Sequence, residues 1–156
     1  MSWLIVIAVI AADQITKYLV SSSMAPGEGF PLIQGILDIC YVRNSGAAFS
    51  SFSGKTVFLV VFTVVLIAGM VFYAIKNRKE LPAAQKIALA LIIGGGIGNL
   101  ADRLRFGSVV DFIETYIIPV FNVADMAITC GGVLLFIAVL AEESKNKRKK
   151  DDGDGR

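Results

Sequence analysis

Residues 56–75 form an apolar run that contains no charged side chain. A helix needs about 20 apolar residues to cross the hydrocarbon core of a bilayer, and this run supplies them. The rest of the chain has the same character, since 55% of its 156 residues are hydrophobic and only 18% are charged. The mean hydropathy is +0.69. The sequence therefore predicts an integral membrane protein.

Three further apolar runs are long enough to span a membrane, and each is interrupted by ionisable residues. They cover residues 2–20, 83–104 and 119–141. Together with residues 56–75 they predict an all-α membrane protein, a bundle of four transmembrane helices. No long polar linker or internal repeat divides the chain, so we expect residues 1–144 to form a single membrane-embedded domain. Residues 145–156 are expected to be a disordered basic tail.

The distribution of basic residues predicts the topology. Six of the 15 Lys and Arg residues lie beyond Ser144, and four more lie in the connection 76–86. Because basic loops stay on the cytoplasmic side, both termini should be cytoplasmic, with residues 21–55 and 105–118 outside. A basic run can also bind nucleic acid, but beside a hydrophobic span it favours contact with anionic lipid. We therefore expect membrane lipid as a partner and no nucleic acid.

The first outer loop has the composition of a small β element. Turn residues in positions 26–31 precede the segment 36–43, which is rich in β-branched and aromatic residues. We expect this element between the first and second helices, on the extracytoplasmic side. A cleaved signal peptide is the alternative for residues 2–20. No Lys or Arg precedes that run, however, and Asp13 and Lys17 stand where a cleavage site should be.

The absence of histidine excludes whole classes of chemistry. Neither a Ser-His-Asp or Cys-His nucleophile nor a His-Glu-x-x-His zinc protease can be built without it. The two cysteines, Cys40 and Cys130, are far apart and show no Cys-x-x-Cys spacing. We therefore expect unpaired packing residues rather than a disulfide or zinc site, and no metal or cofactor.

The glycine-rich segment 94–98 has two interpretations. Gly94 and Gly98 form a small-x-x-x-small pair, which lets a neighbouring helix approach closely. A phosphate-binding loop is the alternative, but no strand precedes the segment and the Lys-Ser/Thr ending is missing. The pattern favours helix packing.

The polar residues within the spans carry the functional information. An ionised side chain at mid-bilayer costs about 2.5 to 3.5 kcal/mol, so its presence needs a reason. From a cytoplasmic N-terminus, Asp13 is roughly 18 Å up the first helix, in the outer half of the membrane. Asp111 follows the third span at the outer face, and Asp125 lies just inside the fourth. Asn44, in the outer loop, can reach the same level.

Helical spacing places these groups in stripes. Asp13 and Lys17 are four residues apart, in the order that favours a salt bridge. Asn99 and Arg103 are also four apart, and Asn122 precedes Asp125 by three. The asparagines can donate hydrogen bonds to a substrate backbone, and the guanidinium can neutralise or orient a carboxylate.

Such groups can also serve only to hold a helix bundle together. That interpretation stays open for Asp13, Lys17, Asp102 and Arg103. It is weaker for Asp111 and Asp125, because no basic residue is near either one in sequence. A proton- or cation-coupled transporter or channel subunit is an alternative function, since intramembrane carboxylates also make ion pathways. A transporter should place such residues along a path to both faces, whereas here they gather toward the outer side. A non-catalytic membrane scaffold is a third possibility.

Five sequence blocks resemble those of one enzyme family. They are Asp-Gln-Ile-Thr-Lys at 13–17, Arg-Asn-Ser-Gly-Ala-Ala-Phe at 43–49, Gly-Gly-Ile-Gly-Asn-Leu-Ala-Asp-Arg at 95–103, Val-Asp-Phe at 110–112 and Phe-Asn-Val-Ala-Asp at 121–125. In this order over four spans, they resemble lipoprotein signal peptidase, also called signal peptidase II, a bacterial family of intramembrane aspartyl proteases. Each block alone is weak, but five in order are specific.

This resemblance implies a function and a site. It implies that the chain removes signal peptides from bacterial prolipoproteins in the cytoplasmic membrane, by cleaving before a diacylglyceryl-modified cysteine. Globomycin-type cyclic peptides should inhibit it. The implied catalytic residues are Asp111 and Asp125, and the implied supporting residues are Asp13, Lys17, Asn44, Gly46, Asn99, Arg103 and Asn122. The 13-residue connection between the two catalytic aspartates is short for the family, which predicts a reduced outer lid.

Overall fold

The computed structural model describes residues 2–46 and 56–154, with side chains described as far as residue 145. Its helices are α1 (Trp3–Ser23), α2 (Thr56–Lys76), α3 (Ala83–Phe106) and α4 (Val123–Asp154). Each contains a stretch long and apolar enough to cross a membrane, so the predicted four-helix bundle is confirmed. Ala47, Ala48 and Phe49 of the second sequence block, and Lys55, lie outside the described residues.

Helix α3 is the centre of the bundle and packs against α1, α2 and α4. Its glycines make this possible, as the segment 94–98 predicted. A methyl group at Gly94 would lie 2.9 Å from Cβ of Val9 in α1. A methyl group at Gly95 would collide with the backbone of Ala124 in α4. Helix backbones approach this closely only where the side chain is a hydrogen atom.

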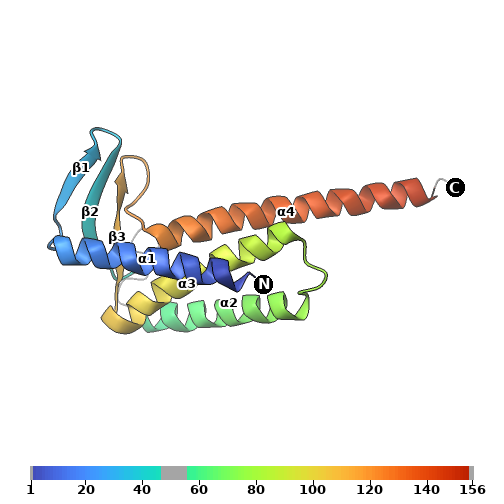
Figure 1. Ribbon diagram of the computed structural model, residues 1–156, viewed down its shortest axis with the longest axis horizontal. Helices are drawn as coiled ribbons and strands as arrows, with labels where there is room; N and C mark the ends of the chain where they lie inside the picture. The colour runs from blue at the N-terminus through green and yellow to red at the C-terminus, as the bar shows by residue number, and fades with distance from the viewer. Residues whose placement is uncertain (1, 47–55, 155–156) are drawn as a thin grey trace.

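Three antiparallel strands form a small sheet at one end of the bundle (Figure 1). The expected β element between α1 and α2 consists of β1 (Gly29–Ile33) and β2 (Leu37–Asn44). The third strand, β3 (Val109–Thr115), lies between α3 and α4 and was not predicted. In the pairing of β2 with β3, Val42 lies opposite Asp111 and Asn44 opposite Val109. The sheet therefore brings the polar end of the first outer loop beside the second.

Helix α4 differs from the prediction at both ends. It begins at Val123 rather than residue 119, because Phe121 forms a β-bridge with Ile113. Proline at position 119 fits this arrangement, since it donates no backbone hydrogen bond. At the other end α4 continues to Asp154, so residues 145–154 of the tail that we expected to be disordered are helical in the structure. Residues 142–150 are mostly Glu, Lys and Arg, which are good helix formers.

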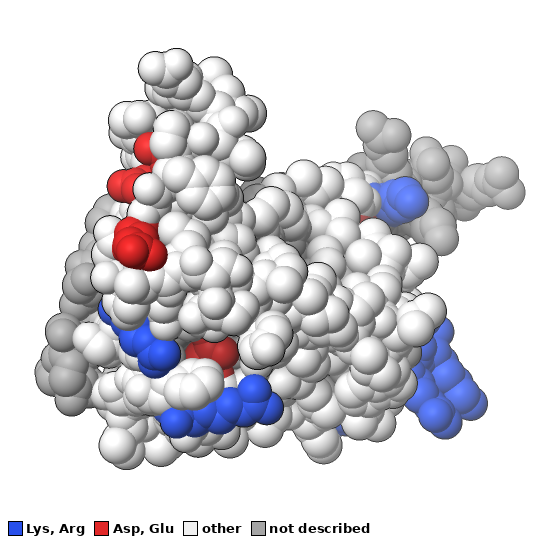
Figure 2. Space-filling view, turned by 60° about the vertical axis from the view of Figure 1, so that its left-hand side comes forward, with Lys and Arg blue, Asp and Glu red and all other residues white. Residues whose placement is uncertain are grey.

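Both chain termini lie at the end of the bundle away from the sheet, and so does the connection between α2 and α3 (Figure 1). Figure 2 shows that charged side chains on the face drawn gather near the sheet and at the far end. The helical surface between them is uncharged, as a surface in contact with lipid must be.

Candidate active site

Asp125 is fixed by the start of α4. The first turn of a helix leaves backbone N–H groups without partners, and side chains near the start can accept their hydrogen bonds. Asn122 Oδ1 accepts a hydrogen bond from the N–H of Asp125 at 2.9 Å, and Asp125 Oδ2 accepts one from the N–H of Asn122 at 3.3 Å. This reciprocal pair is a capping box with aspartate in the position that Glu or Gln usually occupies. It anchors the Asp125 side chain at the helix entrance.

Asp111 is carried by β3, and two amides hold its carboxyl group. Asn122 Nδ2 donates to Asp111 Oδ1 at 2.6 Å, and Asn44 Nδ2 donates to Asp111 Oδ2 at 2.9 Å. Asp111 is only 2% exposed. Burial, with a smaller contribution from Asp125, raises the pKa of Asp111 to about 6, and the two amide hydrogen bonds keep it from rising further. This carboxyl therefore holds a proton at a higher pH than an ordinary aspartate.

Asn99 links Asp125 to a buried lysine. Lys17 Nζ donates to Asn99 Oδ1 at 2.9 Å, and Asn99 Nδ2 donates to Asp125 Oδ1 at 2.8 Å. Asn122 Nδ2 also donates to Asn99 Oδ1, at 3.2 Å. Because two donors face Oδ1, the amide of Asn99 is held with its NH₂ group toward Asp125. The orientation of this side chain is thus set by its partners.

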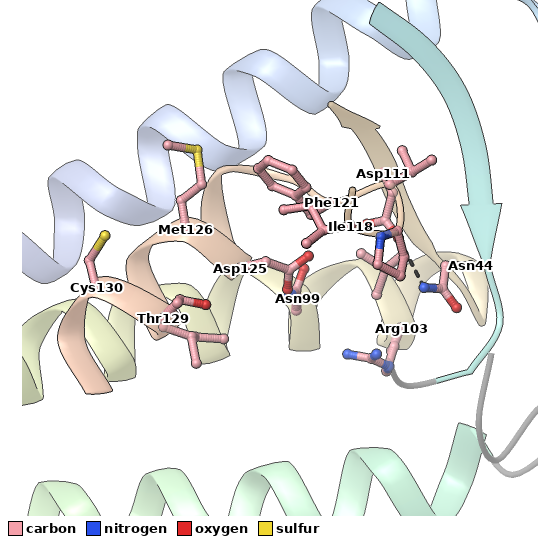
Figure 3. Close-up of a pocket in the computed structure, with 14 residues that line it drawn as sticks. Asn44, Asn99, Arg103, Asp111, Ile118, Phe121, Asp125, Met126, Thr129 and Cys130 are labelled. Carbon is pink, nitrogen blue, oxygen red and sulfur yellow. Dashed lines mark hydrogen bonds between the residues drawn. The ribbon is translucent and has the colours of Figure 1, made fainter. Parts of the chain in front are cut away.

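The two aspartates face a common pocket of about 550 Å³ (Figure 3). Figure 3 shows the side chains of Asn44 and Asn99 beside them, and that of Arg103 below. The pocket is otherwise mostly apolar, lined by Val109, Ile118, Pro119, Val120, Phe121, Met126, Ile128, Thr129 and Cys130. A cavity of this kind, apolar with a few converging polar groups, is typical of a binding or active site.

The remaining predicted residues lie outside the pocket wall. Gly46 adjoins it, because its carbonyl oxygen accepts a hydrogen bond from Arg103 Nη2 at 3.0 Å and its N–H donates to Asn44 Oδ1 at 3.0 Å. Asp13 and Lys17 are buried behind it and form the predicted salt bridge, with Nζ to Oδ2 at 2.9 Å. The structure thus brings every predicted site residue into one connected network, of which part lines the pocket.

Two residues of this network were missing from the predicted site. Asp102 Oδ2 lies 3.1 Å from Lys17 Nζ, and Gln14 Nε2 donates to both Asp13 Oδ2 and Asp102 Oδ1. Asp102 was predicted only as a residue that could hold the bundle together. Its position three residues after Asn99 was the available signal, because residues three apart in a helix share a face.

The arrangement can support general acid–base chemistry. Two carboxyl groups on one pocket can share a proton, so that one acts as base while the other acts as acid. Amides hold both carboxyls in place, and the rest of the pocket wall is mostly apolar. Neither a histidine nor an ionised thiol is needed for such chemistry, which agrees with the absence of histidine from the chain.

Comparisons with known proteins point to one family. A family model described as signal peptidase (SPase) II matches residues 5–141. Curated lipoprotein signal peptidases of Staphylococcus aureus strains JH9 and Newman are each 37% identical over 153 residues, covering 96% of this chain and 93% of theirs.

Solved structures agree with the sequence matches. One, described as a bacterial membrane enzyme determined by the in meso method at 2.3 Å resolution, superposes with a TM-score of 0.87 and 37% identity. It is matched over 92% of this chain and 90% of its own. A second, at 1.9 Å resolution, gives a TM-score of 0.82 and 38% identity, over 89% and 92% of the two chains. With its sequence, its fold and its relatives in agreement, the chain belongs to the signal peptidase II family.

Proposed function

We propose that this membrane protease removes signal peptides from bacterial prolipoproteins by cleaving before the diacylglyceryl-modified cysteine, with Asp111 and Asp125 as its catalytic residues. Membership of the signal peptidase II family makes the chain a protease that acts on peptide bonds. One observation carries the assignment of residues. Two carboxyl groups from separate elements, β3 and the first turn of α4, face one pocket and are each held by asparagine amides.

The mechanism follows from a carboxyl pair that holds one proton. The carboxylate takes a proton from a water molecule, which attacks the scissile carbonyl carbon while the carboxylic acid protonates the carbonyl oxygen. The product is a tetrahedral diol. When the diol collapses the C–N bond breaks, and the carboxyl that gained a proton from water gives it to the leaving nitrogen. The other carboxyl recovers its proton from the diol, so the pair returns to its starting state.

The surrounding polar residues hold the two carboxyl groups and the substrate in position for this reaction. Asn44 and Asn122 hold Asp111, and Asn99 holds Asp125, so neither carboxyl has to reorient during the reaction. Arg103 donates to the carbonyl of Gly46, which keeps its guanidinium at the pocket wall and leaves further N–H donors for a substrate backbone. A substrate held in this way reacts as if intramolecularly.

The proposed location of the site is the outer side of the cytoplasmic membrane. Lys and Arg residues are concentrated at the end of the bundle that carries both termini and the α2–α3 connection, which favours a cytoplasmic location for that end. The sheet and the pocket would then lie toward the outer surface. Residues 1–144 would form the peptidase domain, and residues 145–156 a cytoplasmic extension.

The pocket also offers a position for the lipid group of the substrate, next to membrane lipid. From Asp125 the pocket continues along α4 past Met126, Thr129 and Cys130, toward the left in Figure 3 and within the span. A diacylglyceryl group could remain in contact with lipid there while the peptide reaches the two aspartates. Globomycin-type cyclic peptides would inhibit by occupying the same pocket. A substrate lacking the diacylglyceryl group should therefore be cut far more slowly.

Cleavage by purified protein tests the proposal. The protein in detergent is incubated with a lipid-modified prolipoprotein and with the same precursor lacking the lipid, and the shortened product is measured. The lipid-modified precursor should be processed, and Asp111→Asn should abolish processing. Asp38→Asn is the control, because this residue lies in β2 and does not line the pocket, so cleavage should persist. Absence of product with the parent protein would refute the proposal.

The transporter alternative has no support. The family that the chain belongs to is one of proteases, and the buried ionisable residues lie in one pocket or directly behind it rather than along a path between the two faces.

A further inference from the structure

Three charged residues form a closed cluster behind the pocket. Lys17 Nζ lies 2.9 Å from Asp13 Oδ2 and 3.1 Å from Asp102 Oδ2, so one ammonium group bridges two carboxylates. Asp13, Lys17 and Asp102 are 0%, 3% and 2% exposed. None of the three lines the pocket. Their charges are therefore shielded from water and from any substrate.

Each carboxylate of the cluster also binds one backbone N–H. Asp13 Oδ1 accepts from the N–H of Ala124 at 3.0 Å, and Asp102 Oδ2 accepts from the N–H of Val110 at 3.1 Å. Ala124 is the residue before Asp125, and Val110 is the residue before Asp111. The two backbone positions that carry the aspartates are thus tied to the two carboxylates that Lys17 joins.

We infer that Asp13, Lys17 and Asp102 form a clamp that sets the separation of Asp111 and Asp125 by holding the backbone immediately before each of them. The inference rests on the proposed function, since it assigns positioning residues to the catalytic pair proposed above. It gives Asp102 a role in the reaction, and it gives Asp13 and Lys17 a role more specific than stabilising the bundle.

The geometry of the clamp leaves little freedom. The ammonium group of Lys17 has three N–H donors, and they are used by Asp13, Asp102 and Asn99. Gln14 adds a second bridge, because its Nε2 lies 3.2 Å from Asp13 Oδ2 and 3.0 Å from Asp102 Oδ1. Charge-assisted hydrogen bonds are short and directional, so they define distances more tightly than apolar packing does.

The clamp spans elements that are distant in sequence. Asp13 and Lys17 come from α1 and Asp102 from α3, whereas the N–H groups that they hold belong to β3 and to the first turn of α4. Ala124 is at the second position of α4, where a backbone N–H has no partner within the helix. A carboxylate at this place also interacts favourably with the helix dipole. Asp13 therefore fixes the start of α4 from outside that helix.

Two substitutions test the clamp without creating an unpaired charge. Asp102→Asn and Asp13→Asn each leave Lys17 with one carboxylate partner, so both variants should fold. A reacting group displaced by about 1 Å costs on the order of 10²-fold in rate. Each variant should accordingly lose kcat by that order while KM stays at the parent value, measured well below its unfolding temperature with the lipid-modified precursor.

A matched control separates positioning from stability. Gln85 is also buried, and its Nε2 donates to Glu142 Oε2 at 2.7 Å, near the end of the bundle that is remote from the pocket. Gln85→Leu should lower the unfolding temperature and leave kcat unchanged. The same drop in kcat for Gln85→Leu as for the clamp variants would overturn the inference.

The remaining outcomes are also decisive. Unchanged kcat in both clamp variants, a loss confined to KM, or failure of both proteins to accumulate would each show that the cluster only supports folding. Asp111→Asn is measured in parallel to report on the proposed function. If that variant is inactive while both clamp variants are fully active, the clamp alone is refuted. Near-normal cleavage by Asp111→Asn would refute the catalytic pair and the clamp with it.

Discussion

Replacing Gly98 by alanine should impair both the stability and the activity of this protein. Gly98 lies in α3 where that helix meets Asp13 of α1. A methyl group at this position would lie 2.5 Å from Asp13 Oδ2 and 3.1 Å from its Cγ. Asp13 is fully buried and is bound by Lys17 and by the N–H of Ala124, so it has no alternative position nearby.

The size of the effect follows from this contact. Ordinary contacts begin at 3.4 Å, so relieving a 2.5 Å contact requires a movement of about 0.9 Å. Overpacking of a well-packed core typically costs about 1–3 kcal/mol of unfolding free energy. A shift of about 1 Å transmitted through Ala124 to the neighbouring Asp125 should reduce kcat on the order of 10²-fold.

The assay compares Gly98→Ala with Gly132→Ala, the same substitution at a glycine of α4 that has no described atom within 4 Å of its added methyl group. Unfolding temperature and kcat for the lipid-modified precursor are measured for both. Gly132→Ala should match the parent in both measurements or be slightly more stable, because alanine favours helix. A Gly98→Ala protein with the unfolding temperature and kcat of the parent would refute the reasoning about the Asp13 contact.

Three further predictions concern the proposed catalytic pair and the proposed topology. Asp111→Asn and Asp125→Asn should each reduce turnover by several orders of magnitude, and the double variant should be little worse, because the two groups act as a unit; additive losses in cleavage assays would argue against a pair. The raised pKa of Asp111, about 6 against 3.8, means that the folded state binds its proton more tightly than the unfolded state. Asp111 therefore contributes its full stabilisation, roughly 3 kcal/mol, below about pH 3.8. This contribution is lost as the pH rises to about 6. Across that range the unfolding free energy of the parent should fall relative to that of Asp111→Asn. Parallel curves for the two proteins would contradict this prediction. A reporter fused after Arg156 should indicate the cytoplasm and one within residues 27–35 the outside, and the reverse pattern would contradict the proposed topology.

Much of the fold was predictable because its signals are local. A helix in lipid needs a fixed length of apolar sequence, so residues 56–75 were sufficient to predict α2, which ends one residue later. The spacing of Asp13 and Lys17 predicted their salt bridge, because four residues in a helix return to the same face. The glycines of residues 94–98 predicted a close helix contact, which the packing of α3 confirms.

The start of α4 shows where local signals were present but not used. The sequence Asn122-Val-Ala-Asp125 fits a capping box, and this pattern would have placed the helix start at Val123 rather than at residue 119. Residues 109–113 are mostly β-branched or aromatic, and this was likewise available as a strand signal. The segment is short, however, and the strand gains its hydrogen bonds from β2, whose paired residues are at least 65 positions away in sequence.

The sequence by itself determined the membrane character, the four spans, the absence of histidine chemistry and the motif blocks that indicate the family. These depend on composition and on spacing within one element. Only the tertiary structure decided that Asp102 shares Lys17 with Asp13, that these two carboxylates hold the residues before Asp111 and Asp125, and that the pocket continues along α4. Such relations depend on how α1, α3, β3 and α4 pack. A contact between residues 111 positions apart, like that of Asp13 with Ala124, has no periodic signal in the chain.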